Sequence, residues 1–152
     1  MKMERRAMDL GSVMKNKNLN PREKELMELI WSSAVPLTSI EMLDQLDPEK
    51  WNKLSVFRTI NSLTAKKYIR VDGFEQYNTQ YARKFTFSIS REEYMAKLMR
   101  EDGMGIESLG RVAVALLGED SDSDENSRDA LIESLQEIID KLKEENEDKA
   151  GD

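Results

Sequence analysis

Cysteine and histidine are both absent from this chain of 152 residues. Without them the chain cannot form a disulfide, a zinc site built from Cys or His, a catalytic pair that uses Cys or His, or an imidazole pH switch. No apolar run approaches the roughly 20 residues that a membrane-spanning helix needs. The first residues, "MKMERRAMDLGSVMKNKN", are basic but contain no apolar signal-peptide core. We therefore expect a cytoplasmic protein without metal, cofactor or membrane contact.

Charge is distributed unevenly along the chain, although its net value is −7. Residues 1–90 hold 15 Lys or Arg and 11 Asp or Glu, which gives +4, whereas residues 91–152 hold 8 and 19, which gives −11. An asymmetry of this kind indicates that the two parts have different tasks. We expect the mildly basic part to face phosphates and the acidic part to prevent non-specific contacts.

Three capping-box patterns predict where helices begin, because each places a capping side chain three residues before a Glu. The three boxes are Asn20–Glu23, Thr38–Glu41 and Ser90–Glu93. The first helix carries Pro in its first turn, and the second is expected to end at Asp47, before Pro48. Helical spacing predicts two buried faces, which consist of Leu26, Leu29, Ile30 and Trp31 in the first helix and of Ile40, Leu43 and Leu46 in the second.

A further helix is predicted over residues 52–67, where the chain reads "NKLSVFRTINSLTAKK" with Asn52 as its cap. Apolar residues recur at spacings of four and three, and this core face consists of Val56, Ile60 and Leu63. Surface helices usually carry pairs of Glu and Lys, yet no acidic residue occurs between residues 53 and 69. The face opposite the core is instead predicted to present Ser55, Arg58, Asn61 and Ser62.

Two strands and a turn are predicted directly after this helix. Residues 68–71 form the first strand, and "KFTFSI", residues 84–89, alternates apolar and polar side chains as the second. The segment between them, "DGFEQYNTQYAR", predicts a long polar tip that carries aromatic residues. A very short additional strand is predicted at residues 35–37. The result is a β-hairpin that follows the helix of residues 52–67.

This order of elements predicts a helix-turn-helix followed by a wing. In helix-turn-helix proteins the second helix of the pair places its first residues against base edges in the major groove. The groove favours short hydrogen-bonding side chains and Arg, whereas phosphates repel carboxylates. The alternative for each Lys or Arg is a solvated surface charge. Candidate phosphate contacts around this helix and the wing are Lys53, Lys66, Lys67, Arg83 and Lys84.

Residues 91–152 predict helices that associate with a partner. The segment "IESLGRVAVALLG" is strongly apolar and is expected to end at Gly118, before a solvated acidic linker at residues 119–126. The last helix carries a coiled-coil seam of about two heptads. Because so short a helix is marginal alone, the seam predicts a dimer interface rather than a ligand site. The seam consists of Leu131, Leu135, Ile138 and Leu142.

Four segments in order resemble the penicillinase-repressor family of bacterial winged-helix transcriptional regulators: "LNPREKELMELIW", "PLTSIEML", Trp51 with "SVFRTINSLTAKKYI", and "FTFSISREEY". The resemblance covers Leu19 to about Leu98 and continues more loosely to the C-terminus. It implies a homodimer whose recognition helices enter successive major grooves of a palindromic operator, and helices after the wing that dimerise. By position, it also places Asn52, Ser55 and Arg58 where the family touches bases or adjacent phosphates.

The sequence departs from the family pattern at several places. Ser55 stands where the family usually has Thr, Lys67 stands where it usually has Gly, and the N-terminal extension is longer. The Cys cluster of the copper-responsive branch is missing, which argues against copper sensing. The segment "MREDGMGIESLG" contains no match to the site at which the antibiotic-responsive branch is cleaved. The upstream sensor or protease, if there is one, is therefore not indicated.

Together these patterns predict a mainly α fold with a small β-hairpin. The expected parts are a flexible extension at residues 1–18, a winged-helix DNA-binding domain at 19–90 and a helical dimerisation region at 91–152. The expected function is a homodimeric, sequence-specific DNA-binding repressor; the alternative is a winged-helix adaptor that binds protein. An enzyme is disfavoured, since "GMG" at 103–105 lacks the GK[ST] of a phosphate loop. Besides the candidate phosphate contact Lys67, the expected DNA contacts are Asn52, Lys53, Ser55, Arg58, Thr59, Ser62, Lys66, Arg83 and Lys84.

Overall fold

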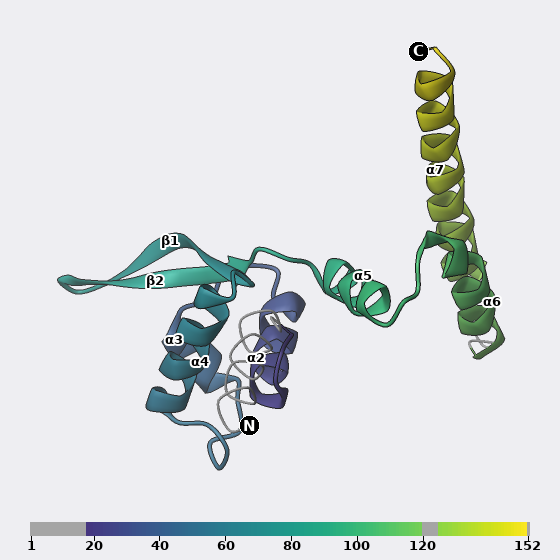
Figure 1. Cartoon of the computed structure of the whole chain (residues 1–152). Coiled ribbons are helices and arrows are strands. Elements are labelled where there is room, and N and C mark those ends of the chain that lie inside the picture. Colours follow the sequence, from purple (N-terminus) through teal and green to yellow (C-terminus); the bar gives the residue numbers. More distant parts are fainter. Residues whose placement is uncertain (1–17, 120–124, 152) are drawn as a thin grey trace, which may run out of the picture. The chain divides into compact units, whose positions relative to one another are not determined.

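A computed structural model describes residues 18–119 and 125–151 of the chain. The chain divides into two compact units, of which one ends at Met99 and the other begins at Arg100 (Figure 1). Within the described ranges, a search for a helix with the length and hydropathy of a membrane span finds none. The predicted extension at residues 1–18 lies outside the described residues except for Asn18. Residues 120–124 of the predicted linker also lie outside them.

Three helices begin the first unit: α2 (Pro21–Ser32), α3 (Ser39–Asp44) and α4 (Lys53–Ala65). The predicted caps of α2 and α3 are confirmed, because both capping boxes are closed by hydrogen bonds in each direction. The cap of α4 is Asn52, as expected, and Ser55 closes its box. Residues 45–52 connect α3 to α4, and these two helices occupy the positions of the predicted helix-turn-helix pair.

A two-stranded antiparallel hairpin follows, formed by β1 (Ile69–Tyr77) and β2 (Gln80–Phe87), and it extends away from the three helices (Figure 1). The predicted long polar tip is wrong, since Tyr77 already pairs with Gln80 and the turn is short. Asn78 makes this turn possible with a φ of 54°, which Asn tolerates better than most residues. The predicted short strand near Leu37 is a single bridge to Phe85.

The core of this unit lies between α2, α3, α4 and the base of the hairpin. Val56, Ile60 and Leu63 contribute to it from α4, as their spacing predicts. One prediction for α3 is wrong: Ile40 is 50% exposed, and Met42 is fully buried in its place. A six-residue helix gives too short a pattern to choose between neighbouring faces. Helix α5 (Arg91–Glu101) adds Tyr94, whose ring lies edge-on to Tyr68 with centroids 5.7 Å apart.

The second unit contains a 3-10 turn, η1 (Ile106–Ser108), and two helices, α6 (Leu109–Glu119) and α7 (Glu125–Ala150). Helix α6 passes the predicted end at Gly118 by one residue, and α7 begins inside the predicted linker. None of the described residues of this unit is buried. The unit therefore consists of helices whose apolar side chains lack a core of their own.

Candidate nucleic-acid interface

The N-terminus of α4 is fixed by a capping box that occupies two predicted DNA contacts. The Oδ1 of Asn52 accepts from the Ser55 backbone N–H at 2.8 Å. The Ser55 Oγ accepts from the Asn52 backbone N–H at 2.8 Å and donates to the Asn52 carbonyl at 2.9 Å. The Ser55 hydroxyl is therefore used within the helix start, whereas the exposed Asn52 side chain still presents its amide NH₂.

Thr59 requires a correction among the expected contacts. It lies with Val56, Ile60 and Leu63 on the buried side of α4 and is 8% exposed. Its hydroxyl donates to the Ser55 carbonyl one turn earlier, at 2.8 Å. A hydroxyl that is buried and already bonded to the backbone cannot reach a base, so Thr59 is removed from the proposed interface.

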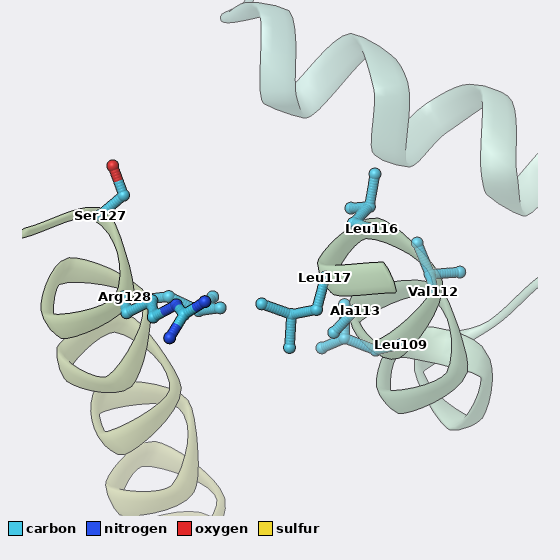
Figure 2. A pocket seen from close by; sticks show the side chains of 8 residues that line it. Leu109, Val112, Ala113, Leu116, Leu117, Ser127 and Arg128 are labelled. Carbon is cyan, nitrogen blue, oxygen red and sulfur yellow. The ribbon is translucent and has the colours of Figure 1, made fainter. Parts of the chain in front are cut away.

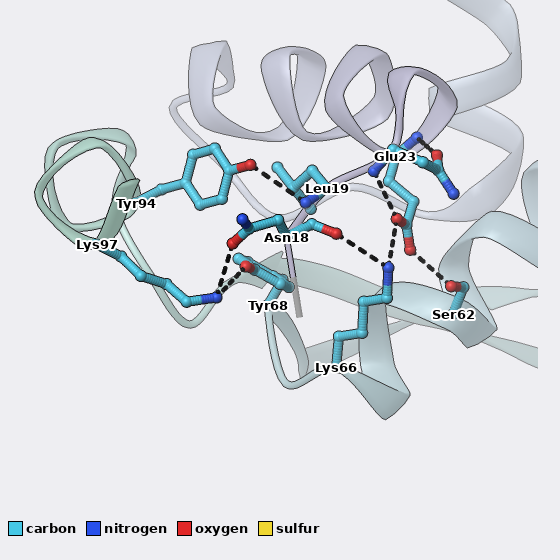
Figure 3. A network of polar contacts seen from close by, with 9 residues as sticks. Asn18, Leu19, Glu23, Ser62, Lys66, Tyr68, Tyr94 and Lys97 are labelled. Atoms are coloured by element: carbon cyan, nitrogen blue, oxygen red, sulfur yellow. Dashed lines mark hydrogen bonds and ion pairs between the residues drawn. The ribbon is translucent and has the colours of Figure 1, made fainter. Parts of the chain in front are cut away.

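Two more of the expected DNA contacts, Ser62 and Lys66, form hydrogen bonds to Glu23 within the protein (Figure 3). Its carboxylate accepts from the Ser62 Oγ at 2.6 Å and from the Lys66 Nζ at 2.7 Å, although Glu23 itself is 1% exposed. Burial of Glu23 raises its pKa. Hydrogen bonds from the Asn20 N–H, Lys66 and Ser62 together lower the pKa by more than burial raises it, so it lies below its ordinary 4.5. Ser62 and Lys66 therefore attach α4 to the N-terminus of α2 and are not free groups of an outer face.

A second part of this network holds the C-terminal end of α4 to α5 (Figure 3). Lys66 also donates to the Asn18 carbonyl at 3.2 Å. Lys97 of α5 donates to the Asn18 Oδ1 and to the Tyr68 hydroxyl, each at 3.1 Å. The Tyr94 hydroxyl accepts from the Leu19 N–H at 3.1 Å. These bonds, which cross between segments far apart in the sequence, fix the orientation of α4 in the first unit.

The outer face of α4 differs from the predicted face. Leu54 and Phe57 are 55% and 51% exposed, and they share this face with the exposed Arg58 and Asn61. Their spacing of i, i+3, i+4 and i+7 is that of one helical stripe. Sequence reasoning missed the two apolar members, although a stripe opposite Val56 and Ile60 must contain positions 54 and 57. Figure 3 shows instead that Ser62 points toward Glu23 of α2.

A groove of about 450 Å³ runs beside this face, between the N-terminus of α2 and α4. Arg58 and Arg22 both line it. The Arg22 guanidinium donates to the Lys50 carbonyl at 2.8 Å and lies 4.8 Å from the centroid of the buried Trp51 ring. Two arginines on one groove make a cationic edge next to the outer face of α4. Sequence reasoning did not select Arg22, because its position next to Arg58 depends on the packing of α2 against α4.

The hairpin carries the remaining predicted cations. Arg83 is exposed and lies over the Phe85 ring, with 5.6 Å between its guanidinium carbon and the centroid. Lys84 is half-buried and lies near Glu41, whose pKa is lowered mainly by hydrogen bonds from Thr38 and to a smaller extent by Lys84. Lys53 is exposed at the start of α4. The structure thus places Arg83 and Lys53 on open surface, whereas a neighbouring carboxylate partly compensates Lys84.

The model of the penicillinase repressor family matches residues 19–141, which is most of the chain. This chain belongs to the penicillinase repressor family. The predicted resemblance is therefore confirmed. As a member of this family the chain is a DNA-binding transcriptional repressor, and the expectation that it is not an enzyme is also confirmed.

Three solved structures that match this chain have low sequence identity and low TM-scores. A MarR family regulator from Neisseria meningitidis is 15% identical, with 95% of this chain and 93% of that chain covered and a TM-score of 0.39. The adhesin competence repressor of Streptococcus pyogenes is 13% identical, with coverages of 93% and 98% and a TM-score of 0.37. Staphylococcus aureus MarR, in complex with salicylate and kanamycin, is 15% identical, with coverages of 94% and 87% and a TM-score of 0.38. No curated protein matches the sequence.

Proposed function

We propose that this repressor acts in the cytoplasm as a homodimer on a palindromic operator, with α4 of each copy in the major groove. The observation that supports this most directly is the outer face of α4, which presents Arg58 and Asn61 on a helix without any acidic residue. A face of this kind suits a polyanion whose base edges offer hydrogen bonds. The second helix of a helix-turn-helix is also the element that enters the groove in this fold class.

The proposed contacts divide into base reading and phosphate binding. Arg58 is assigned to a guanine, to which Arg can donate two parallel hydrogen bonds, and Asn61 to a neighbouring base edge. Four cations and one amide at the start of α4, beside the groove and on the wing are assigned to phosphates, which fix the register without reading sequence. The proposed phosphate contacts are Arg22, the Asn52 amide, Lys53, Arg83 and Lys84.

The apolar surface of the second unit supports a dimer. Figure 2 shows Leu117 pointing from α6 toward Arg128 of α7, across a groove of about 380 Å³ that side chains of both helices line. Leu131 borders the same groove and begins the seam that continues through Leu135, Ile138 and Leu142. Apolar helices without a core of their own become stable when they pack against a second copy. A twofold dimer then places two α4 helices on half-sites one DNA turn apart.

The test is selection of bound duplexes from a random-sequence pool by the full-length protein, followed by titration at several salt concentrations. We expect an enriched palindrome whose binding constant falls linearly with salt on logarithmic axes. Arg58→Ala should weaken binding to that duplex by about 1–3 kcal/mol and relax the preference at one base pair of each half-site. Arg100→Ala removes the same charge from outside α4 and should leave the preference unchanged.

Two results would contradict parts of the proposal. An unchanged sequence preference in Arg58→Ala would remove Arg58 from base reading. If the wild-type protein retains no duplex of the pool even at low salt, the chain does not act through α4 on DNA. That result would favour the alternative function, an adaptor that uses its winged helix to bind protein.

A further inference from the structure

Two large apolar side chains are exposed on the outer face of α4. Helix α4 contains five large apolar residues, and three of them are in the core. The other two, Leu54 and Phe57, remain 55% and 51% exposed, lie three residues apart and both precede Arg58 on the helical stripe. Exposed apolar side chains that share a stripe with recognition residues indicate a contact with something apolar on the partner.

Within residues 18–99, which the structure describes, Leu54 and Phe57 stay open to solvent. The small cavity of about 110 Å³ between α3 and α4 is lined by Ser39, Ile40, Leu43, Lys53 and Val56, and thus by neither Leu54 nor Phe57. The groove toward α2 is bordered by Arg58 rather than by the two apolar residues. The described residues of the first unit thus leave an apolar surface at Leu54 and Phe57 that is open to another molecule.

The charge of the α4 surface indicates which kind of molecule would bind there. The stripe also contains Arg58 and Asn61, Lys53 is exposed beside it, and the thirteen residues of α4 include no carboxylate. A polyanion is the complementary partner, and the apolar group that duplex DNA presents in its major groove is the C5 methyl of thymine. We propose that Leu54 and Phe57 read thymine methyl groups beside the base pair that Arg58 reads. The inference rests on the proposed function, because it requires α4 to lie in the major groove.

Dimensions of helix and duplex agree with this assignment. Three residues of α-helix advance about 4.5 Å along the axis. Neighbouring base pairs of a duplex are about 3.4 Å apart along the helix axis. Leu54 and Phe57 are therefore spaced to meet methyl groups of adjacent base pairs. Each half-site of the operator should accordingly contain A·T pairs directly next to the G·C pair assigned to Arg58.

Replacement of thymine by deoxyuridine tests the assignment, because it removes the methyl group and leaves base pairing and hydrogen-bonding groups unchanged. The probe is the duplex that the wild-type protein selects from the random pool, synthesised with deoxyuridine at one thymine of each half-site at a time. We expect about fourfold weaker binding per methyl group lost at one or two positions and no change at the others, as burial of one methyl group implies.

Protein variants connect each methyl group to its side chain. Leu54→Ala and Phe57→Ala should each bind the thymine duplex more weakly and should no longer distinguish it from the duplex with deoxyuridine at the corresponding position. Val35→Ala is the matched control, since Val35 is 61% exposed in a loop outside α4, and it should retain the full sensitivity to deoxyuridine. Because all three positions are exposed, we expect each variant to fold, and circular dichroism of each variant checks this.

The outcomes separate this inference from the proposed function. If the wild-type protein binds the selected duplex specifically but deoxyuridine changes affinity by less than about twofold at every position, the methyl assignment is wrong and the proposed function stands. If Leu54→Ala and Phe57→Ala bind the selected duplex as the wild-type protein does, neither side chain contacts the DNA and the assignment is again overturned. If no sequence is enriched and no duplex is retained at low salt, the proposed function itself fails.

Discussion

The two units of this repressor solve the problem of burying apolar surface in different ways. In the first unit, Leu26, Met27, Met42 and Leu63 are fully buried within a single copy of the chain. In the second, Val114, Leu116 and Ile132 are 69%, 65% and 63% exposed, and none of its described residues is buried. The winged helix therefore buries its apolar residues within one copy of the chain and is a complete folding unit. The C-terminal helices, by contrast, need a partner surface before their apolar residues stabilise anything.

The largest expected effect comes from breaking the proposed partner surface. Leu135→Asp together with Ile138→Asp places two charges on the seam of α7, so the protein should sediment as a monomer. A monomer binds one half-site at a time, and affinity for the selected palindrome should fall by about 10²–10⁴, the usual gain from linking two sites. Gln136→Asp together with Asn146→Asp adds the same charge at polar positions of α7 and should remain dimeric. If the seam variant also remains dimeric, the interface uses other residues.

The second prediction compares one leucine from each unit. Leu63 is fully buried, and Leu63→Ala should lower the free energy of unfolding by about 2–5 kcal/mol. Leu116 is 65% exposed, and Leu116→Ala should change the stability of the first unit by less than about 0.5 kcal/mol. Tryptophan fluorescence during denaturation measures this difference well, because both tryptophans, Trp31 and Trp51, belong to the first unit. Equal effects of the two substitutions would show that the units unfold as one.

A third, smaller effect concerns the carboxylate that attaches α4 to α2. Glu23→Gln retains a side chain that can close the capping box but loses the ion pair with Lys66, which should cost about 1–3 kcal/mol near neutral pH. The folded-state pKa of Glu23 lies below its ordinary 4.5. Its ionised form therefore stabilises the fold above about pH 4.5, and this contribution is lost as pH falls through the lower, folded-state pKa.

The pH dependence separates this role from simple loss of packing. Between pH 7 and pH 3 the unfolding free energy of the wild-type protein should fall more steeply than that of Glu23→Gln, so that the two curves converge in acid. Glu25→Gln, at an exposed position of the same helix, is the control and should follow the wild-type curve. Parallel curves for Glu23→Gln and the wild type would mean that the ion pair contributes nothing that depends on pH.

Local chemistry determined how much of this architecture the sequence could predict. The caps at Asn20, Thr38, Asn52 and Ser90 were predicted correctly, because a capping box involves residues only three apart. The outer face of α4 was predicted less well. Ser62 donates a hydrogen bond to Glu23, 39 residues earlier in the chain. No local sequence pattern predicts a hydrogen bond between residues so far apart. The apolar residues Leu54 and Phe57 were missed because exposed positions were expected to be polar.

The smallest predicted effect is a gain in stability at the end of α4. Lys67 has a φ of 66°, a left-handed conformation that costs residues with a side chain about 1–2 kcal/mol. The surrounding bonds form a Schellman motif, in which the Tyr68 N–H donates to the Leu63 carbonyl at 2.9 Å and the Lys67 N–H to the Thr64 carbonyl at 3.0 Å. Glycine is favoured at the position of Lys67 in such a motif.

Lys67→Gly should therefore raise the free energy of unfolding by about 0.5–1 kcal/mol, because relief of the left-handed conformation exceeds the entropy that glycine adds to the unfolded chain. Lys67→Ala is the matched control, since it removes the same charge but keeps a Cβ, and it should give no gain. The tryptophan fluorescence transition of the first unit measures both variants. A gain in both would assign the effect to the lost charge, and a loss in Lys67→Gly would mean that the Lys67 side chain stabilises the helix end by contacts that outweigh its backbone strain.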